Sequence, residues 1–220
     1  NKIYIFFGLV LLVSCAPNEV PSKDLVERDG IKYEVNSQTP FTGTNVEFHE
    51  NGQLEYKENY KDGKKDGLSE SYDKNGQLQY KENYKDGEFH GLVERYNNGQ
   101  LQSKENYKDG KLDGLVERYN NGQLQYRNNY KDGKKDGLSE SYDENGQLKY
   151  KENYKDGKLD GLSEYYYENG QLQSKENYKD GKLDGLSEYY YKTGQLQRKA
   201  NYKDGEFHGL SDNYYENGQL

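Results

Sequence analysis

The sequence predicts an all-β fold built from tandem repeats, and three observations support that prediction. A Gly-Gln-Leu motif recurs with its glycine at intervals of 24, 23, 23, 24, 24, 24 and 24 residues, and a fixed period in this range indicates a repeat architecture. Between these glycines, Tyr and Leu alternate with polar residues, which predicts strands. Asn-Gly or Asp-Gly pairs separate the alternating runs, which predicts hairpin turns. The motif glycines are Gly52, Gly76, Gly99, Gly122, Gly146, Gly170, Gly194 and Gly218.

The first segment, residues 1–14, is predicted to be an export signal. Its apolar run, Ile3 to Val13, is 11 residues long, and a helix that spans a bilayer needs roughly 18 or more. The run ends at Cys15, the only cysteine of the chain, in a stretch that resembles the bacterial lipobox. This resemblance implies that Cys15 is lipidated. We therefore expect an exported lipoprotein of the bacterial cell envelope, located at the outer membrane or cell surface.

Three further segments follow the lipidated cysteine. Residues 15–30 show no sustained period and contain two prolines, so they are predicted to form a flexible tether. Residues 31–50 are predicted to be a degenerate half-repeat that caps the array, because Gly43 and Gly52 keep the nine-residue spacing of later units. Residues 51–220 then hold seven tandem periods, the last of which is expected to be clipped.

The composition limits both the core and the partners. Only 30% of the residues are hydrophobic, against roughly 45 to 50% in a typical globular domain, so a thick core is not expected. The 25 tyrosines argue against disorder, since disordered chains contain few aromatic residues. With 31 basic and 39 acidic residues the net charge is −8, and no basic arm interrupts the mixture. Nucleic acid is therefore a poor partner on electrostatic grounds.

The alternation within one unit indicates where the core should be. Leu and Tyr alternate with polar residues from Leu54 to Tyr60 and again from Leu68 to Tyr72. We expect Tyr60, Tyr72 and their equivalents to share one face and to pack against neighbouring units. The two shorter units lose their residue between the last tyrosine and the Asn-Gly turn, so a loop is expected to absorb the change in length.

The segment from Lys151 to Tyr166 resembles a MORN repeat, and it is most similar to the bacterial variant group often labelled YwqK-family antitoxin. Tyr154 stands where MORN units often carry Trp, and Asp160 where many carry His. The resemblance covers roughly residues 41–220 in seven in-phase copies. It implies an elongated, single-layer antiparallel sheet of tandem β-hairpins with about 24 residues per unit. It implies little about chemistry, because a fold does not determine a function.

Two patterns could bind metal, and each has a simpler explanation. Asp62 and Asp66 lie four residues apart in a loop, but the alternating ligands and closing Glu of a calcium-binding EF-hand are missing, so a plain turn is favoured. The three histidines are far apart in sequence and have no cysteine companions, which does not match a zinc site. We predict no metal or cofactor site. The histidines are His49, His90 and His208.

No enzyme signature stands out in the sequence. Glu58 and Glu70 could act as an acid and a base, but each recurs along the array, which favours a scaffold role. They are expected to lie at the margin of the sheet or to pair with lysines across strands. The sequence has neither a phosphate-binding glycine loop nor a nucleophile elbow. Some kinases that make phosphoinositides carry MORN arrays, but the kinase catalytic signature is missing here, so we predict no catalytic residues.

The function expected from these features is a non-enzymatic, lipid-anchored scaffold that binds a protein partner. No small-molecule substrate is expected. One alternative is an antitoxin or immunity-type inhibitor of a specific toxin, as the family label suggests. Another is binding of lipid headgroups or glycans by the aromatic sheet. Four tyrosines on the opposite parity from Tyr166 and Tyr190 are the candidates for partner contact: Tyr165, Tyr167, Tyr189 and Tyr191.

Overall fold

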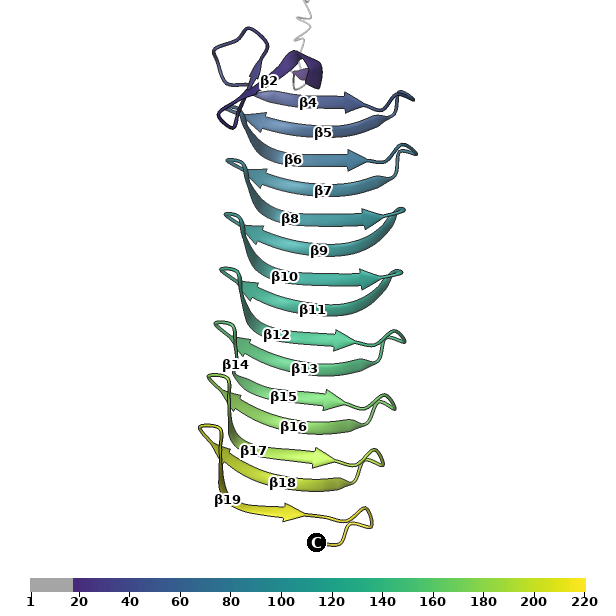
Figure 1. Ribbon diagram of the computed structural model, residues 1–220, viewed down its shortest axis with the longest axis vertical. Coiled ribbons are helices and arrows are strands. Elements are labelled where there is room, and N and C mark those ends of the chain that lie inside the picture. Colours follow the sequence, from purple (N-terminus) through teal and green to yellow (C-terminus); the bar gives the residue numbers. More distant parts are fainter. Residues whose placement is uncertain (1–17) are drawn as a thin grey trace, which may run out of the picture.

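A computed structural model describes residues 18–220, and it shows one long β-sheet whose strands stack along the molecular axis (Figure 1). The sheet has 17 strands, and a separate two-stranded hairpin lies at its N-terminal end. The described residues contain one short 3₁₀ turn, η1 (Ser22–Asp24), and no α-helix. No helix in this part of the chain is therefore long and apolar enough to cross a membrane. The prediction of an elongated, single-layer sheet of tandem hairpins is confirmed.

The strands follow one another in chain order. From β4 onward each strand pairs antiparallel with the next; β14 and β15 both pair with β13 and together form one interrupted strand. The strands are β1 (Glu19–Pro21), β2 (Leu25–Arg28), β3 (Ile31–Glu34), β4 (Gly43–Phe48), β5 (Leu54–Lys61), β6 (Lys64–Tyr72), β7 (Leu78–Lys85), β8 (Glu88–Asn97), β9 (Gln100–Lys108), β10 (Lys111–Asn120), β11 (Gln123–Lys131), β12 (Lys134–Tyr142), β13 (Leu148–Lys155), β14 (Lys158–Leu159), β15 (Gly161–Tyr166), β16 (Leu172–Lys179), β17 (Lys182–Tyr190), β18 (Leu196–Lys203) and β19 (Glu206–Asn213).

The N-terminal part of the structure corrects the prediction of a flexible tether over residues 15–30. Residues 15–17 lie outside the described residues, but β1 pairs in parallel with β4, and β2 pairs with β3. The backbone N–H of Lys32 donates to the carbonyl of Gly63 at 2.9 Å, which ties this hairpin to the array. The predicted boundary at residue 31 therefore falls inside a hairpin. The sequence did not reveal β1 because its partner β4 lies more than twenty residues later, and β2 and β3 are only four residues each.

Two kinds of turn connect the strands. Asp62 and Gly63 both have positive φ, +49° and +78°, which is the type I′ geometry that matches the twist of a hairpin. Asn98 and Gly99 form the same two-residue turn in a shorter unit, with φ of +49° and +74°. The longer units use a wider turn, in which the Asp73 carboxylate accepts backbone hydrogen bonds from two residues of the loop. The expectation that this loop absorbs the change in length is confirmed.

A bulge beside each Asp-Gly turn explains the repeated asparagine. The register between β5 and β6 shifts between Glu58 and Tyr60, and the Asn59 side-chain amide donates to the Leu68 carbonyl at 2.7 Å. Gly67 faces this amide with a φ of +100°, and a Cβ there would lie 3.5 Å from the Asn59 Cβ. The same amide bond recurs along the array. These six bonds explain why Asn and Gly recur at these two places.

The structure shows that Tyr60 and Tyr72 lie on opposite faces, so the prediction that they share one face is wrong. Across β5 and β6 the residue paired with Glu58 is Ser69, not Glu70. Partners in an antiparallel pair point to the same side of a sheet. The Tyr60 hydroxyl donates to Glu58 at 2.9 Å, and the Tyr72 hydroxyl donates to Glu70 at 3.2 Å. Register between strands, which alternation within one strand cannot reveal, decided the outcome.

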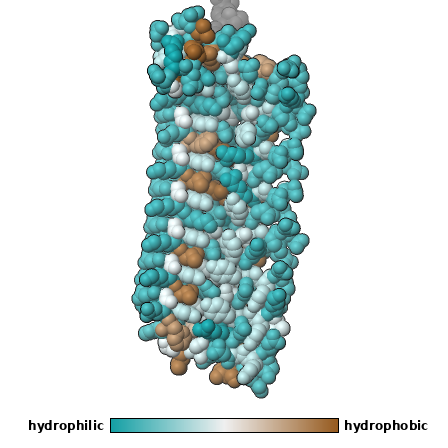
Figure 2. Space-filling view, viewed as in Figure 1, coloured by the Kyte–Doolittle hydropathy of each residue, from teal (hydrophilic) through white to brown (hydrophobic). Residues whose placement is uncertain are grey.

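We name the two faces by their central rows of cross-strand partners. The tyrosine face carries the row that includes Glu58, Ser69 and Glu82. The ladder face carries the row that includes Lys57, Glu70 and Lys81. Apart from η1 and the N-terminal hairpin, which contact the first strands through Ser22 and Lys32, no second layer packs on either face in the described residues, since each strand contacts mainly the strands before and after it. Figure 2 views one face of this layer, where hydrophobic patches follow the long axis as a broken column.

Candidate functional site

The first column of the tyrosine face is a stack of rings and long side chains beside the Asp-Gly turns. Phe89 lies between Tyr84 and Tyr107, with ring centroids 4.8 and 5.0 Å away. Where a unit has lysine instead, the ammonium lies over a ring, as for Lys65 above Tyr84 at 4.9 Å. This ring column supplies much of the apolar contact that a second layer provides in other folds. Its members are Tyr60, Lys65, Tyr84, Phe89, Tyr107, Leu112, Tyr130, Lys135, Tyr154, Leu159, Tyr178, Leu183, Tyr202 and Phe207.

The second column alternates carboxylates with small residues. Each carboxylate accepts a hydrogen bond from the tyrosine two residues later, at 2.6 Å for Tyr107 and Glu105 and at 2.8 Å for Tyr84 and Glu82. Burial raises the pKa of Tyr84, and the bond and charge of Glu82 raise it further. These tyrosines therefore stay protonated and hold the carboxylates. The column includes Glu58, Glu82, Glu105, Glu152 and Glu176, with Asn128 and Ala200 in the remaining units.

Glu105 differs from the other carboxylates because two arginines approach it. Arg95 donates to it at 2.9 Å, and Arg118 pairs with its other oxygen. Only 2% of the Glu105 side chain is exposed. Burial by itself raises the pKa of this carboxyl, but the hydrogen bonds from Tyr107 and Arg95 and the charges of the two arginines outweigh it and hold the pKa below the ordinary value. Glu105 is therefore ionised in the centre of the tyrosine face.

The third column of the tyrosine face changes from unit to unit. Ser71, Arg95 and Arg118 occupy equivalent places, each paired with the strands on both sides. The remaining units carry other side chains at this place, so a repeated frame presents a variable row. We call it the variable column; its members on β6, β8, β10, β12, β15, β17 and β19 are Ser71, Arg95, Arg118, Ser141, Tyr165, Tyr189 and Asn213.

The ladder face carries alternating charges across almost the whole sheet. Its central row continues from Lys57 and Glu70 to Lys199 and Asp212, with bases and acids alternating from one strand to the next. Ion pairs along this row include Lys104 with Glu94 at 3.5 Å and Lys199 with Asp212 at 3.1 Å. The expectation that Glu70 pairs across strands with lysine agrees with this register.

One hollow of about 240 Å³ opens on the tyrosine face between the rings of Tyr56 and Tyr80. Ser69 and Ser71 line it between those rings, and Glu58 and Glu82 flank it. Ser69 is 5% exposed and its hydroxyl has no hydrogen-bond partner. The hollow therefore combines aromatic walls with carboxylates, which is a suitable environment for a cation.

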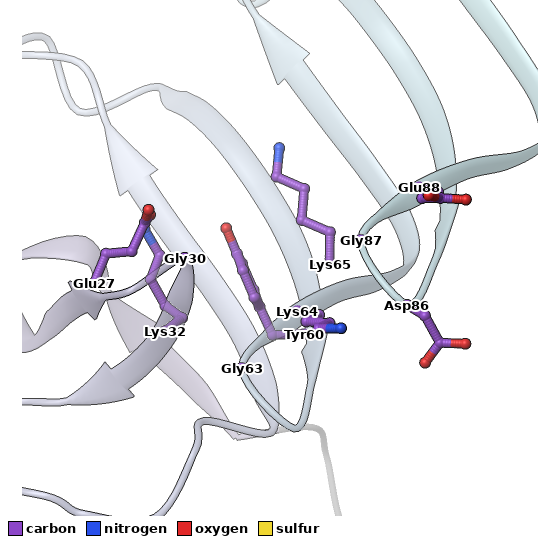
Figure 3. Close-up of a pocket in the computed structure, with 10 residues that line it drawn as sticks. All are labelled: Glu27, Gly30, Lys32, Tyr60, Gly63, Lys64, Lys65, Asp86, Gly87 and Glu88. Atoms are coloured by element: carbon purple, nitrogen blue, oxygen red, sulfur yellow. The ribbon is translucent and has the colours of Figure 1, made fainter. Parts of the chain in front are cut away.

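A second hollow, of about 310 Å³, separates the N-terminal hairpin from the first turns of the array (Figure 3). Glu27 and Lys32 approach it from the hairpin and Lys65 from the sheet, with the ring of Tyr60 between them. Lys32 lies 3.9 Å from Glu27, and Lys65 lies 2.7 Å from Glu58. Because opposite charges here are already paired, this hollow is better explained as the joint between cap and array.

The four tyrosines predicted to contact a partner fall into two structural groups. Tyr165 and Tyr189 belong to the variable column; the Tyr165 hydroxyl donates to Glu152 at 2.8 Å, and burial raises the pKa of Tyr189 to about 12. Tyr167 and Tyr191 start the wide turns, and their hydroxyls donate to the carbonyls of Tyr190 and Tyr214 at 2.8 and 2.9 Å. Partner contact stays a prediction for all four, and each is half-buried.

Tyr167 and Tyr191 also line surface hollows at the edge of the sheet. Tyr167 borders hollows of about 530 and 300 Å³ on the two sides of its turn. Tyr191 borders one of about 350 Å³ near the C-terminal strand. These two tyrosines can therefore both connect neighbouring units and present ring surface to a partner.

The remaining candidate residues from the sequence are Cys15, the histidines and the Asp62–Asp66 loop. Cys15 and the predicted signal peptide lie outside the described residues. Among residues 18–220 no group of three or more His, Cys, Asp or Glu side chains could hold a metal ion. His49 contacts the Tyr72 carbonyl, and His90 lies 3.2 Å from the Asp109 carboxylate. Asp66 accepts a backbone hydrogen bond from Asp86 in the neighbouring turn at 3.3 Å.

Seven segments of the chain match the family model described as MORN repeat variant, and together they make up more than half of its length. The chain belongs to the MORN repeat variant family. The first MORN match begins where β4 is about to start, and each later match spans most of one hairpin. The matched residues are 41–62, 65–86, 90–109, 112–132, 135–156, 159–180 and 183–204.

Comparisons with whole proteins add little to the MORN assignment. No curated protein matches the chain. Among solved structures, a mutant of TarM from S. aureus, in complex with Fondaparinux, alpha-GlcNAc-glycerol and UDP, is similar with a TM-score of 0.26 and 13% identity. The alignment covers 54% of this chain and 19% of that chain. A likeness this weak says nothing about activity here.

Sequence reasoning missed the Arg95–Glu105–Arg118 cluster. The repeat alignment could have drawn attention to both arginines, since they replace a serine or tyrosine of other units. The missing information was register: Arg95 pairs with Ser103, two residues before Glu105, and Arg118 pairs with the same serine from the other side.

Proposed function

We propose that this MORN-variant protein is a non-enzymatic scaffold that binds a protein partner along its tyrosine face. The observation that supports this proposal is the variable column. The tyrosines of the ring column recur in all seven units and the carboxylate column keeps Glu in five of them, whereas the variable column changes among Ser, Arg, Tyr and Asn. A regular frame with one changing row is a means of recognising an irregular surface.

The chemistry of this face suits a protein partner. Tyr80 and Tyr126 are 44% and 36% exposed and lie beside the variable column. Tyr and Arg are enriched in protein interfaces because they combine large contact area with hydrogen-bonding groups. The ladder face instead presents charges that already have opposite neighbours, so it offers fewer unpaired groups.

The proposal also includes a lipid anchor at Cys15, which rests on the sequence alone. Changing Cys15→Ser should abolish labelling of the protein by a fatty-acid probe and release it from the membrane fraction. Full labelling of this variant would remove the anchor from the proposal but leave the binding function intact.

The binding function is tested with matched variants of the two faces. Proteins that copurify with the full chain are identified, the candidate partner is purified separately, and its Kd is measured by calorimetry. Replacing Tyr80 and Tyr126 by Ala on β7 and β11 should weaken binding at least tenfold.

The control changes residues of the same two strands on the ladder face, Lys81→Ala and Arg127→Ala. This double variant should bind within about threefold of the original protein. If the control weakens binding and the tyrosine variant does not, the wrong face has been assigned. If no purified protein binds the full chain, the scaffold proposal fails.

A further inference from the structure

The repeats themselves indicate what the hollow at Ser71 can accept. Ser71 pairs with Tyr56 and Tyr80 on the neighbouring strands. In the next two units the equivalent residues are Arg95 and Arg118, and both guanidinium groups reach the carboxylate of Glu105. The same sheet position is thus filled by an arginine from within the chain in two units and left open in the first.

The two carboxylates beside the open position differ in their partners within the chain. Glu58 pairs with Lys65 at 2.7 Å and accepts the Tyr60 hydroxyl at 2.9 Å. Glu82 accepts the Tyr84 hydroxyl at 2.8 Å through one oxygen, and no cation of the described residues pairs with it. Arg95, the nearest guanidinium along the variable column, is bonded to Glu105 instead. One carboxylate oxygen therefore remains open at this hollow.

We propose that the hollow bounded by Tyr56, Ser71, Tyr80 and Glu82 binds the guanidinium group of an arginine supplied by the protein partner. This inference rests on the proposed function and names one group that the partner presents. A guanidinium stacks on aromatic faces and donates several hydrogen bonds in one plane, so it can reach the open Glu82 oxygen and a neighbouring acceptor together, whereas a lysine ammonium is a compact point charge. The unpaired Ser69 hydroxyl on the hollow wall offers a further acceptor.

The fourth unit provides a matched control within the same molecule. Ser141 also pairs with two tyrosines, Tyr126 and Tyr150. The residue equivalent to Glu58 is the uncharged Asn128, whose side chain accepts the Ser139 hydroxyl. The residue equivalent to Glu82 is Glu152, and its two oxygens accept the hydroxyls of Tyr154 and Tyr165 at 2.9 and 2.8 Å. This position has no open carboxylate oxygen for a guanidinium.

The direct test uses a short blocked peptide, acetyl-Gly-Arg-Gly-amide, titrated into the full chain. Tyrosine ring signals are followed by NMR, with Tyr56→Phe and Tyr80→Phe used for assignment. We expect saturable shifts at Tyr56 and Tyr80 and no comparable shifts at Tyr126 and Tyr150. The peptide with citrulline in place of arginine should bind at least tenfold more weakly, and the peptide with lysine at least threefold more weakly. Equal binding of either peptide, or no saturable shift, overturns the proposal.

Variants supply the second arm of the test. Ser71→Arg places the guanidinium in cis, as in the next two units, and should weaken peptide binding at least tenfold. Ser141→Arg is the matched control and should change it less than twofold. Should Ser71→Arg fail to fold, Glu82→Gln carries the test, with the same tenfold loss expected. Binding of the peptide to a folded Ser71→Arg or Glu82→Gln protein within twofold of the original overturns the assignment.

The same variants separate this inference from the proposed function. A native partner that binds Ser71→Arg normally, yet loses binding to the Tyr80 and Tyr126 double variant, would refute the arginine site while supporting the scaffold. A partner that loses binding to Ser71→Arg but not to Ser141→Arg supports both.

Discussion

The two faces of this sheet use the same strands but are stabilised in different ways. On the tyrosine face, rings stack along the molecule, buried serines and valines lie between carboxylates, and Glu105 is 2% exposed. On the ladder face, acids and bases alternate at the surface, as with Lys104 at 40% exposure beside Glu94. Exposed ion pairs contribute little to stability, because solvent already stabilises each charge. We therefore expect the tyrosine face to contribute most of the stability and specificity.

The largest expected effect is the loss of a buried ring from the tyrosine face. Tyr60 is 9% exposed and packs near Phe41, with ring centroids 6.0 Å apart. Tyr60→Ala should lower the free energy of unfolding by about 3 kcal/mol, because truncating a buried aromatic leaves a cavity. Tyr72→Ala, on the ladder face, should cost about half as much or less, as measured by urea denaturation. Equal losses would show that both faces are packed to the same degree.

A smaller effect is expected when the buried charge of Glu105 is removed. Glu105→Gln leaves Arg95 and Arg118 facing each other without the carboxylate. A fully buried pair broken in this way costs roughly 3 to 5 kcal/mol, but the two arginines are 32% and 39% exposed, so about 2 kcal/mol is expected by the same principle. Glu94→Gln on the ladder face is the control, with a change of about 0.5 kcal/mol. A control that loses as much as Glu105→Gln would contradict the comparison.

The stabilising effect of ionised Glu105 should also disappear at acid pH. The pKa of Glu105 is lower in the folded protein than its ordinary value of 4.5. A lowered pKa stabilises the fold at neutral pH, and this contribution is lost as the pH falls below 4.5 toward the folded value. The stability difference between the original protein and Glu105→Gln should therefore shrink as the pH falls from 5 toward about 3. A difference that stays constant over that range would show that the charge of Glu105 is not its source.

Tyrosine hydroxyls on both faces should ionise at alkaline pH, but at different pH values on the two faces. Burial raises the pKa of Tyr119 on the ladder face to about 12, and the bond from its hydroxyl to Glu117 contributes. Burial raises the pKa of Tyr84 on the tyrosine face above that of Tyr119. The unfolded chain ionises first, near pH 10, so stability should fall as the pH rises from 10 through 12. NMR of the rings should show Tyr119 ionising before Tyr84, and the reverse order would contradict the assigned burial.

The smallest effect is expected from the ladder face itself. Lys104→Ala should lower the free energy of unfolding by about 0.5 kcal/mol or less, because Lys104 is 40% exposed and solvent stabilises its charge. In a double-mutant cycle with Glu94→Ala, the coupling energy should likewise be below about 1 kcal/mol. A coupling well above this value would mean that the alternating charges act as a cooperative network along the sheet.

Local features of the sequence were sufficient to predict much of this fold. The 24-residue period, the alternation around Tyr60 and the Asp62–Gly63 turn each depend on residues close together in the chain. Turn geometry follows from the backbone preferences of Asp, Asn and Gly, and strands follow from alternation. The strands and hairpins of the repeat array, and the place where shorter units lose a residue, were therefore predicted correctly.

Pairing between distant residues decided what the sequence left open. The two-residue turn pairs Lys61 with Lys64, so even-numbered residues of β5 face odd-numbered residues of β6. The bulge shifts the register by two residues and keeps this parity, which leaves Tyr60 and Tyr72 on opposite faces. Likewise β1 is a strand only because β4, more than twenty residues later, pairs with it. The hollow at Ser71 and the cluster at Glu105 exist because neighbouring strands bring their side chains to one face. Residue types and period are local properties, whereas a shift of one residue in register exchanges the two faces of a strand, and only the tertiary structure shows which register is formed.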